Sequence, residues 1–198
     1  MDLYAAIEAK YGFAIPEDYR RMERDGFFDL HNDATYLYMH EMEWMRPDEI
    51  LAHTPASFHK PGFIPFAFTG ASDEWCWCPA MDPKAVVSCP HDDMFGTFDA
   101  PDFLGSLYRR CLDAALEIYP DEAEVRGQYA TWISSLANYF PPAWIETLQS
   151  IAEAPVIHLY NGKLPYEALL THHDYDKLVA RDLAFPRLNE QFAWMYEQ

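Results

Sequence analysis

Residues 63–78 have the sequence FIPFAFTGASDEWCWC, which places two short apolar runs on either side of a small polar segment. Aromatic side chains dominate both runs, and such side chains fit the pleated, half-buried surface of a β-strand. The segment between the runs contains Gly70 and Asp73, which are residue types that favour tight turns. The sequence therefore predicts a β-hairpin with strands at residues 63–68 and 74–78.

The second strand of this hairpin alternates tryptophan with cysteine. Because side chains alternate across a strand, Cys76 and Cys78 should share one face, and Trp75 and Trp77 the other. One zinc ligand set is conceivable, and it combines three thiols with an imidazole: Cys76, Cys78, Cys89 and His91. The C-x-C spacing is not that of a zinc knuckle, so buried, reduced thiols are the favoured interpretation. A small metal-dependent enzyme that uses these four residues stays open as an alternative.

The pattern outside the hairpin is first helical and then β-like. Asp2 and Gly12 can cap and end a first helix, and Pro16 can open a second. From about residue 27 to residue 87 the pattern is β-like, including the aromatic segment 35–40 and a strand at 85–88. A short helix start at 47–51 interrupts it.

The second half of the chain is mostly helical. Apolar stripes at spacings of three and four predict helices at about 101–118, 121–139 and 142–152 and near 174–184 and 187–197, with a short strand at 156–160. The expected fold is α+β, with a single mixed, largely antiparallel sheet flanked by helices. The expected organisation is a domain over residues 1–118, continued by a mostly helical C-terminal extension over 119–198 that packs on the same domain.

The composition excludes some partners. The chain has 198 residues, of which 50% are hydrophobic, so it can bury a core despite a formal charge of −18. That charge makes nucleic acid and anionic membranes poor electrostatic partners, and it favours a basic protein. The N-terminus lacks the pattern of a secretory signal, and no apolar run approaches the length of a spanning helix. We therefore expect a cytoplasmic protein.

Four stretches, taken in order, carry a resemblance to a known family. They are the opening segment 11–19, the Trp44-x-x-Pro47-x-Glu49-Ile50 segment, the hairpin with its Asp73-x-Trp75-Cys76 start, and the segment from His91-Asp92-Asp93 to Asp102-Phe103-Leu104. Residues 11–112 resemble the SUKH superfamily, named partly for fungal cell-wall synthesis regulators of the Smi/Knr type. The resemblance implies an α+β fold without a shared catalytic constellation.

The same resemblance implies a function in protein binding. Many bacterial members of the superfamily are thought to be immunity proteins that neutralise cognate toxins, often nucleases. Nuclease domains tend to be basic, so a strongly acidic inhibitor would be steered towards one. The expected function is stoichiometric binding of a basic toxin domain, without a cofactor. A regulatory or scaffold protein that binds a cellular partner is the alternative.

Candidate binding residues lie in the predicted loops beside aromatic residues. The carboxylates Asp73, Glu74, Asp92 and Asp93 could steer a partner, while Trp75 could supply buried area. The alternative interpretation is that these acids form solvated turns next to a core aromatic residue.

Catalytic patterns are weak. Glu41 and Glu43 with His40 could be drawn as an acid–base group, but a solvated strand face explains them better. The cluster at 172–176 contains two histidines and two aspartates, for which a helix cap at Asp174 is the simpler account. No nucleotide-binding, serine-hydrolase or zinc-protease motif is present. We therefore expect a protein that is not an enzyme.

Overall fold

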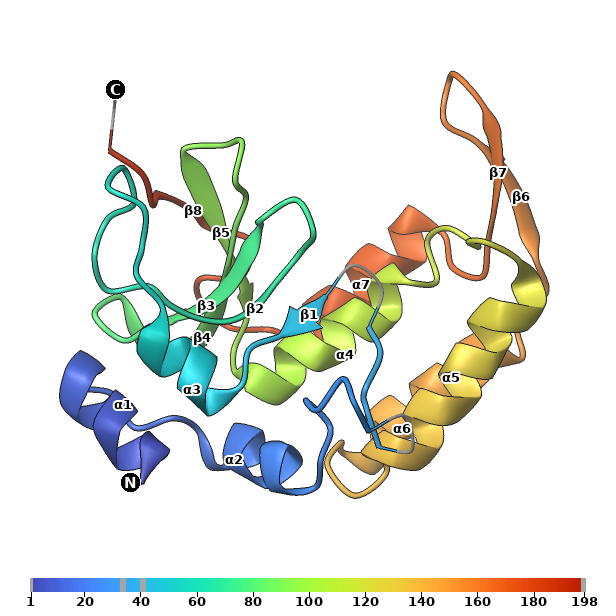
Figure 1. Ribbon diagram of the computed structural model, residues 1–198. Coiled ribbons are helices and arrows are strands. Elements are labelled where there is room, and N and C mark those ends of the chain that lie inside the picture. Colours follow the sequence, from blue (N-terminus) through green and yellow to red (C-terminus); the bar gives the residue numbers. More distant parts are fainter. Residues whose placement is uncertain (1, 33–34, 40–41, 197–198) are drawn as a thin grey trace. The chain divides into compact units, whose positions relative to one another are not determined.

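A computed structural model describes residues 2–32, 35–39 and 42–196 and shows an α+β fold (Figure 1). The expected α+β class, with a largely antiparallel sheet and flanking helices, is confirmed. The described strands form two sheets rather than a single mixed one, and all their pairings are antiparallel. Tertiary contacts divide the chain into two compact units, residues 1–106 with 185–198, and residues 107–184. The domain boundary expected at residue 118 stays a prediction.

The first unit is built on a six-stranded sheet with the strand order β1-β2-β3-β4-β5-β8, in which every neighbouring pair is antiparallel. The strands are β1 (Glu43–Trp44), β2 (Ile64–Phe68), β3 (Glu74–Cys78), β4 (Asp82–Cys89), β5 (Phe95–Ala100) and β8 (Gln191–Ala193). The strands predicted at 63–68, 74–78 and 85–88 are thus confirmed as β2, β3 and part of β4.

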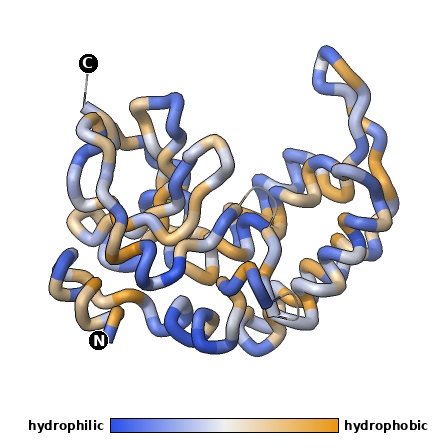
Figure 2. The backbone as a smooth tube through the Cα atoms, viewed as in Figure 1, coloured by the Kyte–Doolittle hydropathy of each residue, from blue (hydrophilic) through white to orange (hydrophobic). Residues whose placement is uncertain are grey.

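The first helices of this unit begin and end close to their sequence signals, whereas the helix predicted at about 101–118 is shorter and ends at Asp113. In α1 (Leu3–Tyr11) the Asp2 side chain accepts the N–H groups of the first turn, and Gly12 ends the helix with a φ of +64°. Helices α2 (Glu17–Arg24) and α3 (Pro47–Ala52) follow, and α4 (Phe103–Asp113) continues into the second unit. Figure 2 shows that most of α2 is hydrophilic, so its contact with the core rests on the buried Tyr19 and Met22.

One face of the sheet is covered by aromatic residues from α2 and α4. The indole of Trp77 lies 4.6 Å from the ring of Phe66 and 5.4 Å from that of Tyr19, measured between ring centroids. Phe103, from the first turn of α4, meets Phe66 edge-on at 5.3 Å. Rings of this size bury enough apolar surface to dominate the energetics of a small core.

The opposite face is covered by the end of the chain. Cys76 and Cys78 lie there, on the other side of β3 from Trp77, as the alternation predicts. Trp194 and Met195 close over them, together with Phe192. The last residues therefore complete the core of the first unit.

Three sequence predictions about elements are wrong or incomplete. The helix predicted near 187–197 is absent from the described residues 187–196, because apolar residues of this segment belong to strand β8, which pairs with β5. Residues 35–39 form no strand; the Leu37 N–H donates to Phe27 O, and Met39 makes only an isolated bridge to Met42. Strand β5 was not predicted.

Gly96 shows why β5 is possible. A β-carbon at this position would lie 2.6 Å from the Phe192 ring and 2.8 Å from Ser88 O. Glycine within a strand often marks a place where another part of the chain comes very close to the backbone. In the sequence alone, Gly96 instead suggests that a strand ends there.

The second unit contains α5 (Glu122–Leu136), α6 (Pro142–Ala152), α7 (His172–Asp182) and a hairpin of β6 (Ile157–Tyr160) and β7 (Pro165–Ala168). The Tyr129 hydroxyl donates to Cys111 O, and the N–H groups of Leu169 and Leu170 donate to Ala115 O. Tyr108 stacks on Trp144 at 4.4 Å between centroids. In Figure 1 the β6–β7 hairpin projects from the helices of its unit.

No helix in the described part of the chain is both long enough and apolar enough to cross a membrane.

Candidate functional site

The predicted acidic residues lie in two loops at one end of the six-stranded sheet. Asp73 and Glu74 stand where the β2–β3 connection enters β3, and Asp92 and Asp93 stand between β4 and β5. Glu74 pairs with Cys89 in the β3–β4 ladder, so the two connections emerge side by side. We call residues 69–74 and 89–94 the acidic loops.

An ion pair joins the acidic loops. Asp73 Oδ1 lies 2.8 Å from His91 Nδ1 and also accepts the His91 backbone N–H at 2.8 Å. Partial burial opposes ionisation of Asp73, but these hydrogen bonds lower its pKa, while the side-chain bond to Asp73 raises the pKa of His91. The Thr69 hydroxyl accepts the Asp73 N–H at 3.0 Å and so fixes the turn itself.

Two of the five predicted binding residues are less accessible than expected. Trp75 is only 5% exposed and belongs to the core. The side chain of Glu74 is half-buried, and burial raises its pKa. Its carboxylate accepts a hydrogen bond from the Cys76 thiol, with Sγ 3.6 Å from Oε2. The exposed carboxylates at this end of the sheet are therefore those of Asp92 and Asp93, with Asp73 partly accessible.

Exposed apolar side chains accompany these acids; the sequence indicates Phe95 as an aromatic neighbour of these loops but does not single out the others. Met94 and Phe95 follow Asp93 directly, with 40% and 45% of their surface exposed. The Trp194 N–H donates to Met94 O, and the Tyr196 N–H donates to Phe58 O, so the exposed Phe58 and Tyr196 lie on segments that adjoin the second acidic loop. Exposed rings can supply contact area to a protein partner, and neighbouring acids can steer a basic one.

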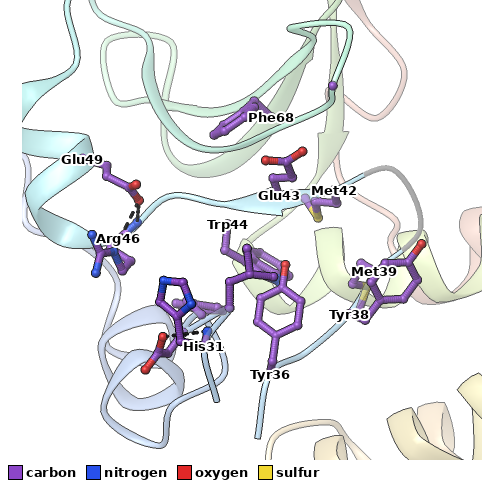
Figure 3. A pocket seen from close by; sticks show the side chains of 14 residues that line it. His31, Tyr36, Tyr38, Met39, Met42, Glu43, Trp44, Arg46, Glu49 and Phe68 are labelled. Atoms are coloured by element: carbon purple, nitrogen blue, oxygen red, sulfur yellow. Dashed lines mark hydrogen bonds and ion pairs between the residues drawn. The ribbon is translucent and has the colours of Figure 1, made fainter. Parts of the chain in front are cut away.

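A pocket of about 500 Å³ lies beside the first acidic loop, and we call it the aromatic pocket (Figure 3). Four segments contribute to it: the residues after α2, the segment before β1, strand β1 with the start of α3, and the end of β2. The lining residues are Phe28, Asp29, Leu30, His31, Tyr36, Tyr38, Met39, Met42, Glu43, Trp44, Arg46, Glu49, Phe68 and Gly70. Because Gly70 belongs to the first acidic loop, pocket and loop form one continuous surface.

The pocket wall is held in place by buried contacts. Trp44 Nε1 donates to Leu37 O at 2.7 Å, and its ring packs on Phe28 with centroids 4.7 Å apart. Glu43 and Phe68 are direct partners in the β1–β2 ladder, which brings a carboxylate next to an aromatic ring at the rim. Burial raises the pKa of Tyr36, and the nearby Glu43 adds to the shift.

The charges of the described lining residues are unequal, with three carboxylates and one guanidinium. That guanidinium, on Arg46, is already engaged, because it lies 3.3 Å from Asp48 and 3.7 Å from Glu49. The Asp29 carboxylate accepts the His31 N–H at 3.0 Å. The pocket therefore presents a negative field to a ligand.

The described lining carries no serine, threonine, cysteine or lysine. Of the acid–base group considered from the sequence, His40 and Glu41 lie outside the described residues, and Glu43 faces the pocket. The signal for this pocket in the sequence is Glu43, which lies between the apolar residues Met42 and Trp44. From the sequence this pattern is better explained by a carboxylate on a solvent-exposed strand face.

The cysteines are not arranged as a metal site. All four are free and buried, and burial raises the pKa values of Cys76, Cys78 and Cys111. Within the described ranges, the group of three potential metal ligands whose ligand atoms all lie within 4.8 Å of one another is Asp73, His91 and Asp92. In the 172–176 cluster, the helix cap is Thr171, whose hydroxyl accepts the Asp174 N–H, and not Asp174 itself.

The arrangement defines the chain as an α+β protein with acidic loops and an aromatic pocket at one end of an antiparallel sheet. Comparison with protein-family models, with curated proteins and with solved structures gives no match to this chain.

Proposed function

We propose that the protein acts by stoichiometric binding of a basic protein partner, without chemistry, and that the partner is a toxin domain, most simply a nuclease, neutralised in the cytoplasm. The observation that carries the proposal is the combination of exposed carboxylates and exposed rings around the second acidic loop with a negative pocket beside the first acidic loop, all within the first unit. The resemblance of residues 11–112 to the SUKH superfamily supports the same function.

Such binding has two physical steps: the negative charge of the chain attracts the basic partner, and the bound chain then covers the partner's active site. A chain with a formal charge of −18 attracts a basic domain over the range of the Debye length and so raises the association rate. Exposed rings such as Phe95 and Tyr196 then supply the apolar area that holds the complex together. Covering the partner's active site suffices for inhibition.

The test is co-expression with the product of the adjacent gene, combined with copurification of the two proteins. We expect rescue of growth and a one-to-one complex. An adjacent product that is neither toxic nor bound contradicts the immunity proposal. A bound product without toxicity instead supports the regulatory or scaffold alternative.

A pair of charge reversals locates the surface. Asp92→Lys changes an exposed acid in the second acidic loop, whereas Asp176→Lys changes an exposed acid in α7 of the second unit. Both shift the net charge equally. We expect Asp92→Lys to slow association by roughly tenfold at low salt and Asp176→Lys to leave it nearly unchanged, because charges at the contact dominate steering. Equal effects would place the partner elsewhere on the chain.

A further inference from the structure

We infer that the aromatic pocket receives an arginine side chain of the basic partner, with Glu43 as the acceptor of its guanidinium. This inference rests on the proposed function and adds the contact that anchors the partner. Three properties of the pocket support it: an unmatched carboxylate, aromatic walls, and an apolar floor.

The carboxylate of Glu43 is unmatched. Within the described parts of the chain it makes no hydrogen bond or ion pair, although it lies at the rim opposite Phe68. The other carboxylates of the lining are engaged, Glu49 with the Arg46 backbone N–H at 2.7 Å and Asp29 with His31. Glu43 is thus the lining carboxylate left to accept hydrogen bonds from a ligand.

The walls and floor match the other parts of an arginine side chain. Figure 3 shows Tyr36, Tyr38 and Phe68 around the hollow that Glu43 borders. A guanidinium stacks on such rings while its N–H groups form a fork on a carboxylate, a combination that an ammonium group reproduces less well. Met39 and Met42 are buried, and their flexible side chains suit the methylene stem.

The charge of the pocket selects against anionic ligands. The only guanidinium among the described lining residues, on Arg46, is held by Asp48 and Glu49. The remaining carboxylates would therefore repel a phosphate or carboxylate ligand, whereas they would attract a cation. Because the pocket shares Gly70 with the first acidic loop, a basic protein steered to that loop also presents its arginines to the pocket.

The probe that tests the pocket is N-acetyl-arginine amide, titrated into the full chain while the methionine methyl signals are followed by NMR. We expect saturable shifts of the Met39 and Met42 methyl groups with a Kd of about 1 mM, as for a small fragment with a few contacts. N-acetyl-citrulline amide, which has a similar shape without the charge, should bind at least about tenfold more weakly.

Variants assign the contact to residues. Glu43→Gln should weaken binding of the arginine probe by about tenfold or more, because it removes the charge and keeps the shape. Phe68→Leu should also weaken it by removing a ring, and Asp176→Asn is the matched control at an exposed acid of the second unit. Equal binding of arginine and citrulline probes, equal binding of N-acetyl-lysine amide, or unaltered binding to Glu43→Gln would each overturn the inference.

The two proposals fail in different ways. If the arginine probe binds as expected but no basic protein partner is found, the pocket assignment stands and the proposed function fails. If a basic partner binds and Glu43→Gln leaves its affinity unchanged, the proposed function stands and the pocket assignment fails.

Discussion

Asp73 holds the imidazole of His91 at 2.8 Å, and the same oxygen accepts the His91 backbone N–H. Because the carboxylate favours the imidazolium, the pKa of His91 lies above its ordinary value of 6.5, and Asp92 adds to the shift. Asp73→Asn keeps an oxygen acceptor for the backbone N–H but removes the charge. We expect the pKa of His91 to fall towards 6.5 in this variant, measured by NMR titration of the imidazole protons.

The pH range over which this ion pair stabilises the fold follows from the directions in which the pKa values of His91 and Asp73 are shifted. The raised pKa of His91 means that its contribution to stability is complete below pH 6.5 and is lost as the pH rises through the folded-state pKa. The lowered pKa of Asp73 means that its contribution is present above pH 3.8 and is lost as the pH falls through the folded-state value. Asp93→Asn is the control. A His91 titration that Asp73→Asn leaves unchanged would show that the contact does not form in solution.

At the residue scale, the sequence located the acids but not their partners. Asp73, Asp92 and Asp93 were found because aspartate is common in turns, whereas the Asp73–His91 pair depends on two loops that only the β3–β4 ladder brings together. Trp75 is buried, which agrees with the alternative of a core aromatic residue beside the turn. The alternation that placed Cys76 apart from Trp77 was correct, since it follows from strand geometry alone.

Strand β8 and the residues after it show how a distant segment completes the first unit. Trp194 is fully buried, its Nε1 donates to Asp93 O at 2.8 Å, and its ring lies 4.2 Å from that of His59. Trp194→Ala removes this packing and leaves a cavity against the cysteine face. We expect it to lower the free energy of unfolding by about 3–5 kcal/mol, measured by urea denaturation.

The matched control is Tyr196→Ala, two residues further on, where half of the side-chain surface is exposed. That variant should change the free energy of unfolding by no more than about 0.5 kcal/mol. Comparable values for the two variants would mean that the end of the chain does not cover the sheet.

Elements with strong local signals were predicted, and elements defined by distant partners were not. The caps at Asp2 and Asp121 and the hairpin around Gly70 act within a few residues, so they are visible in the sequence. Strand β8 forms because it pairs with β5, about ninety residues earlier in the chain, whereas β5 also pairs with the neighbouring β4. Neither has a periodicity long enough to reveal it, and β8 carries apolar residues that also fit a helical stripe.

The charge of the whole molecule has a kinetic consequence rather than a structural one. A formal charge of −18 is spread over the entire chain, so it raises the encounter rate with any basic partner, while the contacts at the acidic loops and the aromatic pocket determine how long the complex lasts. The Debye length shrinks from about 30 Å at 0.01 M salt to about 8 Å at 0.15 M, which removes most of the long-range attraction.

We therefore expect the association rate constant with the basic partner to fall by about ten- to hundredfold between those two salt concentrations. The dissociation rate constant should change much less, because desolvated contacts are screened weakly. Both constants are measured by stopped-flow mixing. In the Glu43→Gln variant the salt dependence of association should persist, because seventeen of the eighteen excess charges remain, while dissociation becomes faster. An association rate that does not respond to salt would show that the acid excess does not steer the partner, and the acidic loops would then act through contact alone.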